Sequence, residues 1–371
     1  FRTTDGAVTI EKPDAQGAYR PVTFDDRCTD ATGAVVSTTN NRLTGITAGA
    51  ASGVSTDAGQ ASANPGQTIT LNGASFDTGM DIVFQTTDAA GKLAERVVRP
   101  NTVSADGTQA QVTVPLNAVS GTVRLVGDLN GTAIPLQILP VVTGVDVSAV
   151  DPVGNTATVV LTGLGFVEGN GSEYRFGSGA DGLVILDAGV SLGADVQQIY
   201  DAARGEYVNG RVVLTVPLSA GAFGPISVRT TGGTSASYSV SLSSVTATAL
   251  SGTPADAGEA SANPGQAITL NGSGLSTTTD VLLRYTDING EAVIRQVSPT
   301  AAAADGTSAT LVVPQDANGA FRVQVFGSAS QPKLQIVPRL TRAAFDGTLS
   351  LYGAGFVEGG TQYQVGGVSV S

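Results

Sequence analysis

Hydrophobic and polar residues alternate along most of this chain with a period of two. In the segment 67–72, Ile69 and Leu71 fall on one side of an extended backbone, while threonine and asparagine fall on the other. This alternation predicts a strand with one face buried in an antiparallel sheet. The segment 81–98 repeats the pattern on both sides of the connection from Asp88 to Gly91, which is typical of a β-hairpin.

Short alternating segments of this kind fill the chain, with turn residues at intervals of about 8–12 residues, a spacing typical of β-sandwiches. No segment shows the period of an amphipathic helix. The segment 193–204 is the one place where the sequence would allow a single helical turn. The predicted fold class is therefore all-β.

Two long stretches of the sequence are near copies of one another. Residues 57–73 return as residues 256–272, at an offset of 199 residues. The likeness extends to Val114-Pro115 and Val313-Pro314, so the two copies define one module type, which we call A. Self-similarity at a long, fixed spacing is the signature of a repeat protein.

A second module type, which we call B, lies between and after the two A copies. Residues 161–169 return as residues 351–359, at an offset of 190 residues. The predicted order is A-B-A-B, arranged end to end as a rod because prolines such as Pro140 stiffen the short connections. The predicted boundaries are an unassigned N-terminal β segment at 1–45, module A1 at 46–140, module B1 at 141–245, module A2 at 246–338, and a truncated start of module B2 at 339–371.

The modules share a motif that has a known counterpart. In A1, Pro65-Gly66 opens an apolar-x-apolar-x-Gly-x-x-Phe stretch that ends at Phe76, and Val114-Pro115 precede a turn and a closing strand. This pattern resembles the IPT/TIG family of immunoglobulin-like domains. Module A2 matches it over 263–275, whereas B1 matches at 159–166 and lacks the Pro-Gly opening.

The resemblance covers residues 46–371 and implies seven-stranded immunoglobulin-like β-sandwiches without a disulfide. It does not define an activity, because the family occurs in bacterial surface proteins, enzyme accessory domains, receptors and transcription factors. Together with the tandem order and the abundant glycine, serine and threonine, the chain looks most similar to the repeat region of a large bacterial surface adhesin or extracellular filament.

Composition narrows the functional classes. The chain has 19 Lys and Arg against 31 Asp and Glu, a net charge of −12, which repels polyphosphate and argues against nucleic acid as a partner. No apolar run reaches the roughly 18 residues of a membrane-spanning helix. The sequence opens at Phe1 without a signal peptide, so we expect a processed product or a fragment of a secreted or cell-surface protein.

Candidate chemistry is sparse. The chain contains no histidine and a single cysteine, which removes Ser-His and Cys-His arrangements and makes a zinc site improbable. No phosphate-binding glycine motif is present. We therefore predict that the protein is not an enzyme, with no catalytic, cofactor-binding or metal-binding residue assigned. Cys28 is expected either to be a small buried hydrophobe or to pair with another chain.

Calcium is the one ion that the composition leaves open, because acidic loops between sandwich domains often bind it. None of the candidate carboxylates has an Asp-x-Asp-x-Asp spacing, so no site is assigned. The candidates are Asp25, Asp26, Asp30, Asp57 and Asp256.

The unfinished module B2 raises the question of partners. Half a sandwich would expose its core face and an open edge, so either a longer chain continues or another chain supplies the missing strands. The segment 1–45 is the expected donor, since Phe1 to Gly6 echoes Val228 to Gly233 near the end of B1.

The predicted function is that of a non-enzymatic extracellular structural or adhesive repeat protein, whose partners are other copies of itself, adjacent repeats, or surface glycans. The alternative is an accessory binding-module array of a secreted polysaccharide-active enzyme, which would require a surface strip of aromatic side chains.

Overall fold

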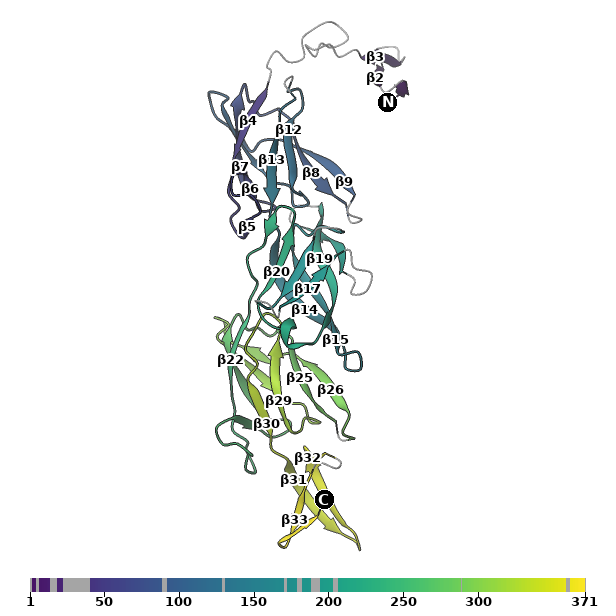
Figure 1. Ribbon diagram of the computed structural model, residues 1–371, viewed down its shortest axis with the longest axis vertical. Helices are drawn as coiled ribbons and strands as arrows, with labels where there is room; N and C mark the ends of the chain where they lie inside the picture. The colour runs from purple at the N-terminus through teal and green to yellow at the C-terminus, as the bar shows by residue number, and fades with distance from the viewer. Residues whose placement is uncertain are drawn as a thin grey trace. The chain divides into compact units, whose positions relative to one another are not determined.

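The computed structural model describes residues 2–4, 7–13, 19–22, 41–88, 92–128, 131–169, 172–178, 182–187, 194–202, 206–287, 289–357 and 361–370. Nearly all regular structure in these ranges is β-strand, and the single helical element among them is a 3-10 turn at Ala220–Ala222 (Figure 1). The predicted all-β class is confirmed. The chain forms two compact units: most residues up to Ile138 form the first, and the segments 52–57 and 87–92 join the rest in the second.

The first unit contains one two-sheet sandwich and a small separate sheet. The small sheet has the order β1-β2-β3, formed by Arg2–Thr4, Ala7–Pro13 and Tyr19–Val22. The strands of the sandwich are β4 (Arg42–Thr47), β6 (Ser62–Ala63), β7 (Thr68–Ala74), β8 (Ile82–Thr87), β9 (Leu93–Val98), β10 (Thr102–Val103), β11 (Gln109–Thr113), β12 (Gly121–Leu125) and β13 (Ala133–Ile138). They form one sheet in the order β10-β11-β7-β4 and another in the order β6-β13-β12-β8-β9.

Alternation along β7 explains the core of this first sandwich. Ile69 and Leu71 are buried, as the sequence predicted, while Thr68 faces solvent. They pack against buried residues of the facing sheet such as Phe84 and Val123. Strand β4 starts at Arg42 and pairs with β7, so this strand spans the predicted boundary at residue 46.

The second unit begins with a sandwich whose strands, apart from β5, lie between residues 141 and 234. One sheet has the order β14-β15-β19-β18, and the other has the order β17-β16-β20-β21-β5. The strands are β5 (Val54–Ser55), β14 (Val141–Asp151), β15 (Thr156–Leu164), β16 (Glu173–Phe176), β17 (Leu183–Leu186), β18 (Ala194–Asp201), β19 (Glu206–Pro217), β20 (Ile226–Thr230) and β21 (Gly233–Thr234).

Two features of this second sandwich were not foreseen. The segment expected to allow a helical turn forms β18 instead, because it pairs with the long strand β19 and extends a hairpin. Strand β5 lies in the loop that follows β4, in a much earlier part of the sequence, and it pairs antiparallel with β21 at the edge of the sheet. Thr56 extends this pairing by donating its backbone N–H to the carbonyl of Gly232 at 3.0 Å.

The third sandwich repeats the strand order of the first. Its sheets have the orders β22-β24-β28-β27 and β23-β30-β29-β25-β26, which correspond strand by strand to those described above. The strands are β22 (Ser241–Thr246), β23 (Ala260–Ala262), β24 (Ala267–Ser273), β25 (Val281–Thr286), β26 (Ala292–Val297), β27 (Ala301–Ala302), β28 (Ser308–Val312), β29 (Ala320–Val325) and β30 (Lys333–Ile336).

Two hairpins follow the third sandwich. Strand β31 (Arg339–Phe345) pairs with β32 (Leu349–Ala354), and β33 (Tyr363–Val365) pairs with β34 (Val368–Val370). These correspond to β14 to β17 of the second sandwich, and no counterpart of β19 or β20 covers them in the described residues.

The glycine of the shared apolar-x-apolar-x-Gly motif has a common role. In each copy a Cβ atom at this glycine would lie about 2 Å or less from a backbone carbonyl oxygen of the adjacent strand in the sheet: 2.0 Å at Gly73, 2.0 Å at Gly163, 1.7 Å at Gly272 and 2.0 Å at Gly353. The neighbouring strand carries a register shift at that place, as between Leu43 and Gly45. Only glycine allows this close approach, which explains why the motif recurs.

Candidate functional site: the junction of the second and third sandwiches

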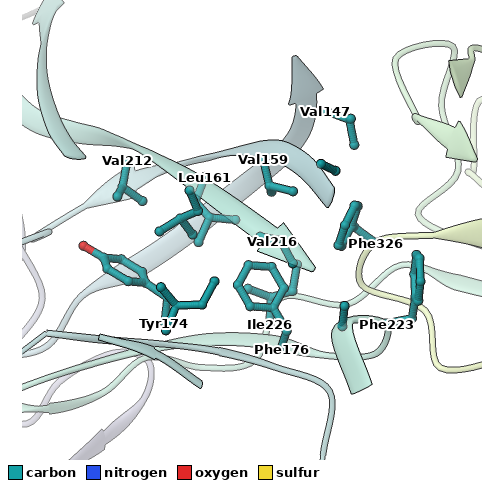
Figure 2. Packing of buried hydrophobic residues seen from close by; sticks show 14 of the residues in the cluster. Val147, Val159, Leu161, Tyr174, Phe176, Val212, Val216, Phe223, Ile226 and Phe326 are labelled. Atoms are coloured by element: carbon teal, nitrogen blue, oxygen red, sulfur yellow. The ribbon is translucent and has the colours of Figure 1, made fainter. Parts of the chain in front are cut away.

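The second and third sandwiches share one apolar cluster. Phe326, which follows β29 of the third sandwich, is only 2% exposed because it packs into the core of the second. Its ring stacks on Phe223 at a centroid distance of 5.1 Å and meets the edge of Phe176 at 6.1 Å (Figure 2). Leu282 and Ile294 belong to the same cluster, so side chains of the third sandwich extend the core of the second, while the other buried residues of the third sandwich form a core of their own.

Polar contacts at the same junction cap an open strand edge. Strand β14 lies at the edge of its sheet, and it has a register shift just after Val147. The backbone N–H of Val147 donates to the carboxylate of Asp280 at 2.6 Å, and its carbonyl accepts from Gln296 at 2.6 Å. Gln296 also donates to Asp280 at 2.8 Å. Two side chains of the third sandwich therefore replace the missing strand partner of the second.

A third contact lies near the β14–β15 turn. Asn155 has a positive φ of 52°, a conformation that asparagine tolerates better than most residues. Its side-chain carbonyl accepts a hydrogen bond from the guanidinium of Arg284 on β25. Apolar packing, a capped edge and this bond are thus three kinds of contact between the two sandwiches of the second unit.

The first sandwich carries a different set of residues at the equivalent positions. Val126 takes the place of Phe326 and is 51% exposed, and Val97 takes the place of Gln296 and is 54% exposed. Asp81 takes the place of Asp280 and pairs with Arg99 at 3.4 Å. Phe326 and Gln296 are thus particular to the third sandwich and are not required by the shared fold, whereas the aspartate is present in both copies.

A buried acidic pair lies within the second sandwich. Asp187, at the end of β17, is 7% exposed and accepts a hydrogen bond from the hydroxyl of Tyr174 at 2.8 Å. Burial raises the pKa of Asp187 to about 6, and the neighbouring carboxyl group of Glu168 also raises it, against the lowering effect of the Gly169 amide. Burial, followed by the charge of Asp187, raises the pKa of the Tyr174 hydroxyl well above its usual value.

An exposed aromatic pair lies on the long hairpin of the second sandwich. Tyr200 on β18 and Tyr207 on β19 are direct cross-strand partners, with ring centroids 5.2 Å apart. They are 57% and 62% exposed. The corresponding strands β10 and β27 of the other two sandwiches are only two residues long, so this hairpin and its tyrosines are specific to the second sandwich.

The two terminal hairpins expose an apolar face. Their side chains line a groove of about 400 Å³. In the second sandwich the corresponding residues Val159, Leu161, Phe166, Tyr174, Phe176 and Ile185 are all buried. The groove is lined by Leu349, Leu351, Phe356, Tyr363, Val365 and Val370.

The calcium candidates do not form a site in the described chain. Asp25, Asp26, Asp30 and Cys28 lie outside the described residues. Asp57 is exposed, and Asp256 accepts a hydrogen bond from the backbone of Gly258 at 2.8 Å, which closes its own turn. Among the residues that the structure describes, no group of three or more acidic or cysteine side chains could hold a metal ion.

Sequence reasoning missed the junction and the acidic pair. Phe326 stands where the first A copy has a valine, and this substitution between near-identical copies was the available signal. Glu168 belongs to the repeated Phe-Val-Glu-Gly stretch, so its recurrence at Glu358 was visible but had no assigned role. Nothing in the sequence indicated that Asp187 would lie beside it.

Comparisons with known proteins give no family assignment. No family model matches the chain, and no curated protein matches it. Its described ranges contain no helix with the length and apolar character needed to cross a bilayer.

Among solved structures, a tetra-tandem repeat from the extending region of a large adhesion protein is similar at 17% identity and a TM-score of 0.17, over 76% of this chain and 73% of that one. SGBP-B from a xyloglucan utilization locus in Bacteroides uniformis is similar at 12% identity and a TM-score of 0.20, over 80% and 99%. A Ca²⁺-stabilized adhesin that helps an Antarctic bacterium bind ice is similar at 14% identity and a TM-score of 0.15, over 81% and 76%. These scores are too low to support a functional argument, which therefore rests on the residues of this chain.

Proposed function

We propose that this protein is a non-enzymatic structural or adhesive repeat protein of the bacterial cell surface, built from immunoglobulin-like sandwiches of the IPT/TIG type in the order A-B-A-B. The observation that supports this most is the junction at Phe326, where a side chain of the third sandwich packs into the core of the second. A binding domain on a flexible linker does not require packing against its neighbour. A structural spacer that has to keep its length when it is pulled does require it. The alternating modules would then form a semi-rigid rod.

The stiffness of the junction can be measured directly. Small-angle X-ray scattering of the intact chain is expected to give a narrow distribution of distances between the second and third sandwiches. The variant F326A should broaden that distribution, because the ring that packs into the core of the second sandwich is lost. The matched variant V126A, at the equivalent exposed position of the first sandwich, should leave the scattering unchanged. Equal flexibility of wild type and F326A would contradict the proposal.

The apolar groove of the terminal hairpins supports a second part of the proposal, that adjacent repeats or other copies of the chain are its partners. Strands with the alternation of β19 and β20 would cover the groove and complete a sandwich, a form of β-strand addition. Concentration-dependent association in sedimentation velocity is the expected result. V370K, which places a charge in the groove, should reduce it, and association that V370K leaves unaltered would exclude this surface.

The exposed pair Tyr200 and Tyr207 favours a second candidate function, the binding of surface glycans by an accessory module. Aromatic rings held at fixed spacing on a rigid hairpin can stack on the apolar faces of sugar rings, and tyrosine adds a hydroxyl for hydrogen bonds. Affinity electrophoresis in gels containing soluble polysaccharides would test it. Retardation of wild type but not of Y200A/Y207A would favour this function, and equal mobility in every gel would remove it.

A further inference from the structure

The outer strand of one sheet in the second sandwich has an exposed apolar edge. Strand β17 stands first in the order β17-β16-β20-β21-β5, and among the described residues it pairs with β16 alone. Its four residues are Leu-Val-Ile-Leu, with neither charge nor proline. Val184 is 47% exposed and Leu186 is 55% exposed, while Ile185 between them is buried in the core. Large apolar side chains therefore lie beside an open strand edge.

The corresponding edge strands of the other two sandwiches carry charged residues. Strands β9 and β26 stand at the end of their sheets, next to β8 and β25, as β17 stands next to β16. Strand β9 contains Glu95 and Arg96, and β26 contains Arg295, which donates to Asp316. Charged side chains on an edge strand disfavour its pairing with another chain. Strand β17 lacks this protection.

The backbone groups that face the open edge of β17 can be identified. The N–H of Asp187, just after β17, donates to the carbonyl of Ser172 on the side of β16 at 3.1 Å. Successive residues of a strand direct their N–H and C=O groups alternately to one side and the other. Val184 and Leu186 therefore direct their N–H and C=O groups away from β16, toward the open edge.

We propose that the β17 edges of two copies of this chain pair antiparallel about a two-fold axis, with Ile185 opposite Ile185 of the second copy. In this register Val184 of each copy lies opposite Leu186 of the other, so the outward-directed N–H and C=O groups of both residues find partners. The buried side chains stay in their cores, and the exposed ones form one apolar patch. The contact uses the same surface on both copies, as a two-fold interface requires.

The charges beside the edge suit this arrangement. Arg175 and Glu173 are the cross-strand partners of Val184 and Leu186, so they lie on the same outward face. The guanidinium of Arg175 pairs with the Glu173 carboxylate, and Nη1 of Arg229 lies 3.5 Å from it. The two-fold axis puts Glu173 in the same cross-strand row as Arg175 of the second copy, so no row carries like charges at its two ends. Two basic side chains around one acidic side chain also offset, at this face, the repulsion expected of chains with a net charge of −12.

Sedimentation velocity with charge variants tests the pairing. The edge is separate from the groove of the terminal hairpins, so V370K is used as the background to remove association through that groove. This background is expected to form weak, concentration-dependent dimers, as small interfaces do. V184K/L186K puts lysine opposite lysine of the second copy and should lower the association constant at least about tenfold.

The matched control changes the same two exposed positions. V184K/L186E puts each lysine opposite a glutamate of the second copy, so it should still associate, and added salt should weaken that association. A monomeric V370K protein at every concentration would overturn the proposal, and so would equal association of the two double variants. The scattering test of F326A does not involve this edge, so the proposed function and this pairing can fail independently.

Disulfide trapping tests the register. In the background C28S/V370K, chains with V184C are mixed with chains with L186C that carry a tag of different mass. Positions 184 and 186 of two copies would lie about 5.5 Å apart between Cα atoms, which suits a disulfide, whereas identical positions would be diagonal neighbours about 7–8 Å apart or more. We expect the mixed dimer to dominate on a non-reducing gel. Self-linkage of V184C as efficient as mixed linkage would overturn the proposed register.

Discussion

The carboxylate of Asp280 accepts a hydrogen bond from the backbone N–H of Val147 at 2.6 Å, although the two residues are 133 positions apart in the sequence. A side chain of one sandwich thus acts as the strand partner of its neighbour. This kind of contact explains how a sheet can end at an open edge without offering that edge to other chains.

Loss of that carboxylate should weaken the junction. D280A leaves the Val147 N–H without its acceptor and removes one of the two acceptors of the Gln296 amide, and we expect the free energy of unfolding of the second unit to fall by about 1–3 kcal/mol. Urea unfolding followed by circular dichroism measures this. D81A in the first sandwich is the control, and it should cost less than about 0.5 kcal/mol because the Asp81–Arg99 pair is exposed to solvent. Equal losses in both variants would contradict the role given to Asp280.

Truncation of the Phe326 side chain should have a larger effect on the free energy of unfolding. F326A removes a buried ring from a cluster that includes Phe176 and Phe223, and such changes cost about 3–5 kcal/mol. Because the ring comes from the third sandwich and packs into the core of the second, differential scanning calorimetry of F326A should also show the two sandwiches melting as separate transitions. V126A should change neither the number of transitions nor their midpoints. A single, merely shifted transition in F326A would show that the sandwiches are coupled by other contacts.

The motif glycine should be intolerant of any side chain. G73A would place a Cβ atom 2.0 Å from the carbonyl oxygen of Arg42 and 2.3 Å from the Phe76 ring. We expect a loss of about 1–3 kcal/mol or more, since the backbone must move to accept the methyl group. G45A, in the paired strand, is the matched control because no atom lies within 4 Å of its Cβ position. Similar midpoints for G73A and G45A in urea would refute the packing argument.

One carboxylate should make the third sandwich sensitive to acid. Asp316 accepts hydrogen bonds from Arg295 at 2.5 Å and Tyr285 at 2.9 Å. Burial acts to raise the pKa of Asp316, but the bonds from Arg295 and Tyr285 outweigh it, and the pKa is lowered overall. A lowered pKa means that the ionised group stabilises the fold above the pKa of the unfolded chain, and that this contribution is lost as the pH falls through the folded pKa.

The variant D316N isolates this contribution. At pH 7 it should unfold at a lower urea concentration than wild type, with a loss of no more than about 1 kcal/mol because the ion pair is partly exposed to solvent. The difference between the two proteins should shrink as the pH falls below the ordinary carboxyl pKa, and it should vanish once the pH lies below the lowered pKa of Asp316 in the folded chain. A difference that stays constant from pH 7 to pH 3 would show that the effect of the substitution is not electrostatic.

The sequence predicted those features of the structure that depend on neighbouring residues, and it missed those that depend on residues far apart in the chain. Alternation is a local property, so the burial of Ile69 and Leu71 and the hairpin after β8 could be predicted from adjacent residues. The strand β18 was missed because its partner β19 stabilises it more than its own propensity does. Repetition predicted that the first and third sandwiches share a strand order, since near-identical sequences have the same local preferences.

The candidate sites depend on contacts that no local pattern encodes. Val147 and Asp280 meet across two sandwiches, at an edge strand whose register shifts just after Val147, and the local sequence does not indicate which neighbour such an edge will contact. Asp187 acquires its environment from Glu168 and Tyr174, which reach it through tertiary packing. Differences between repeat copies, such as Phe326 against Val126, were the one sequence signal that pointed to a site.

The strand β5 shows that the repeating unit of the sequence and the folded unit of the structure have different boundaries. Because Val54 and Ser55 belong to a sheet whose other members lie beyond residue 172, excision at the repeat boundary near residue 140 would remove a strand from the sandwich that follows. Such a fragment would expose the unpaired edge of β21, which would favour pairing with strands of other chains. Recombination within an array like this one therefore has to keep the segment that carries β5 together with the sandwich that begins at β14, although the strands β6 to β13 of the first sandwich lie between them in the sequence.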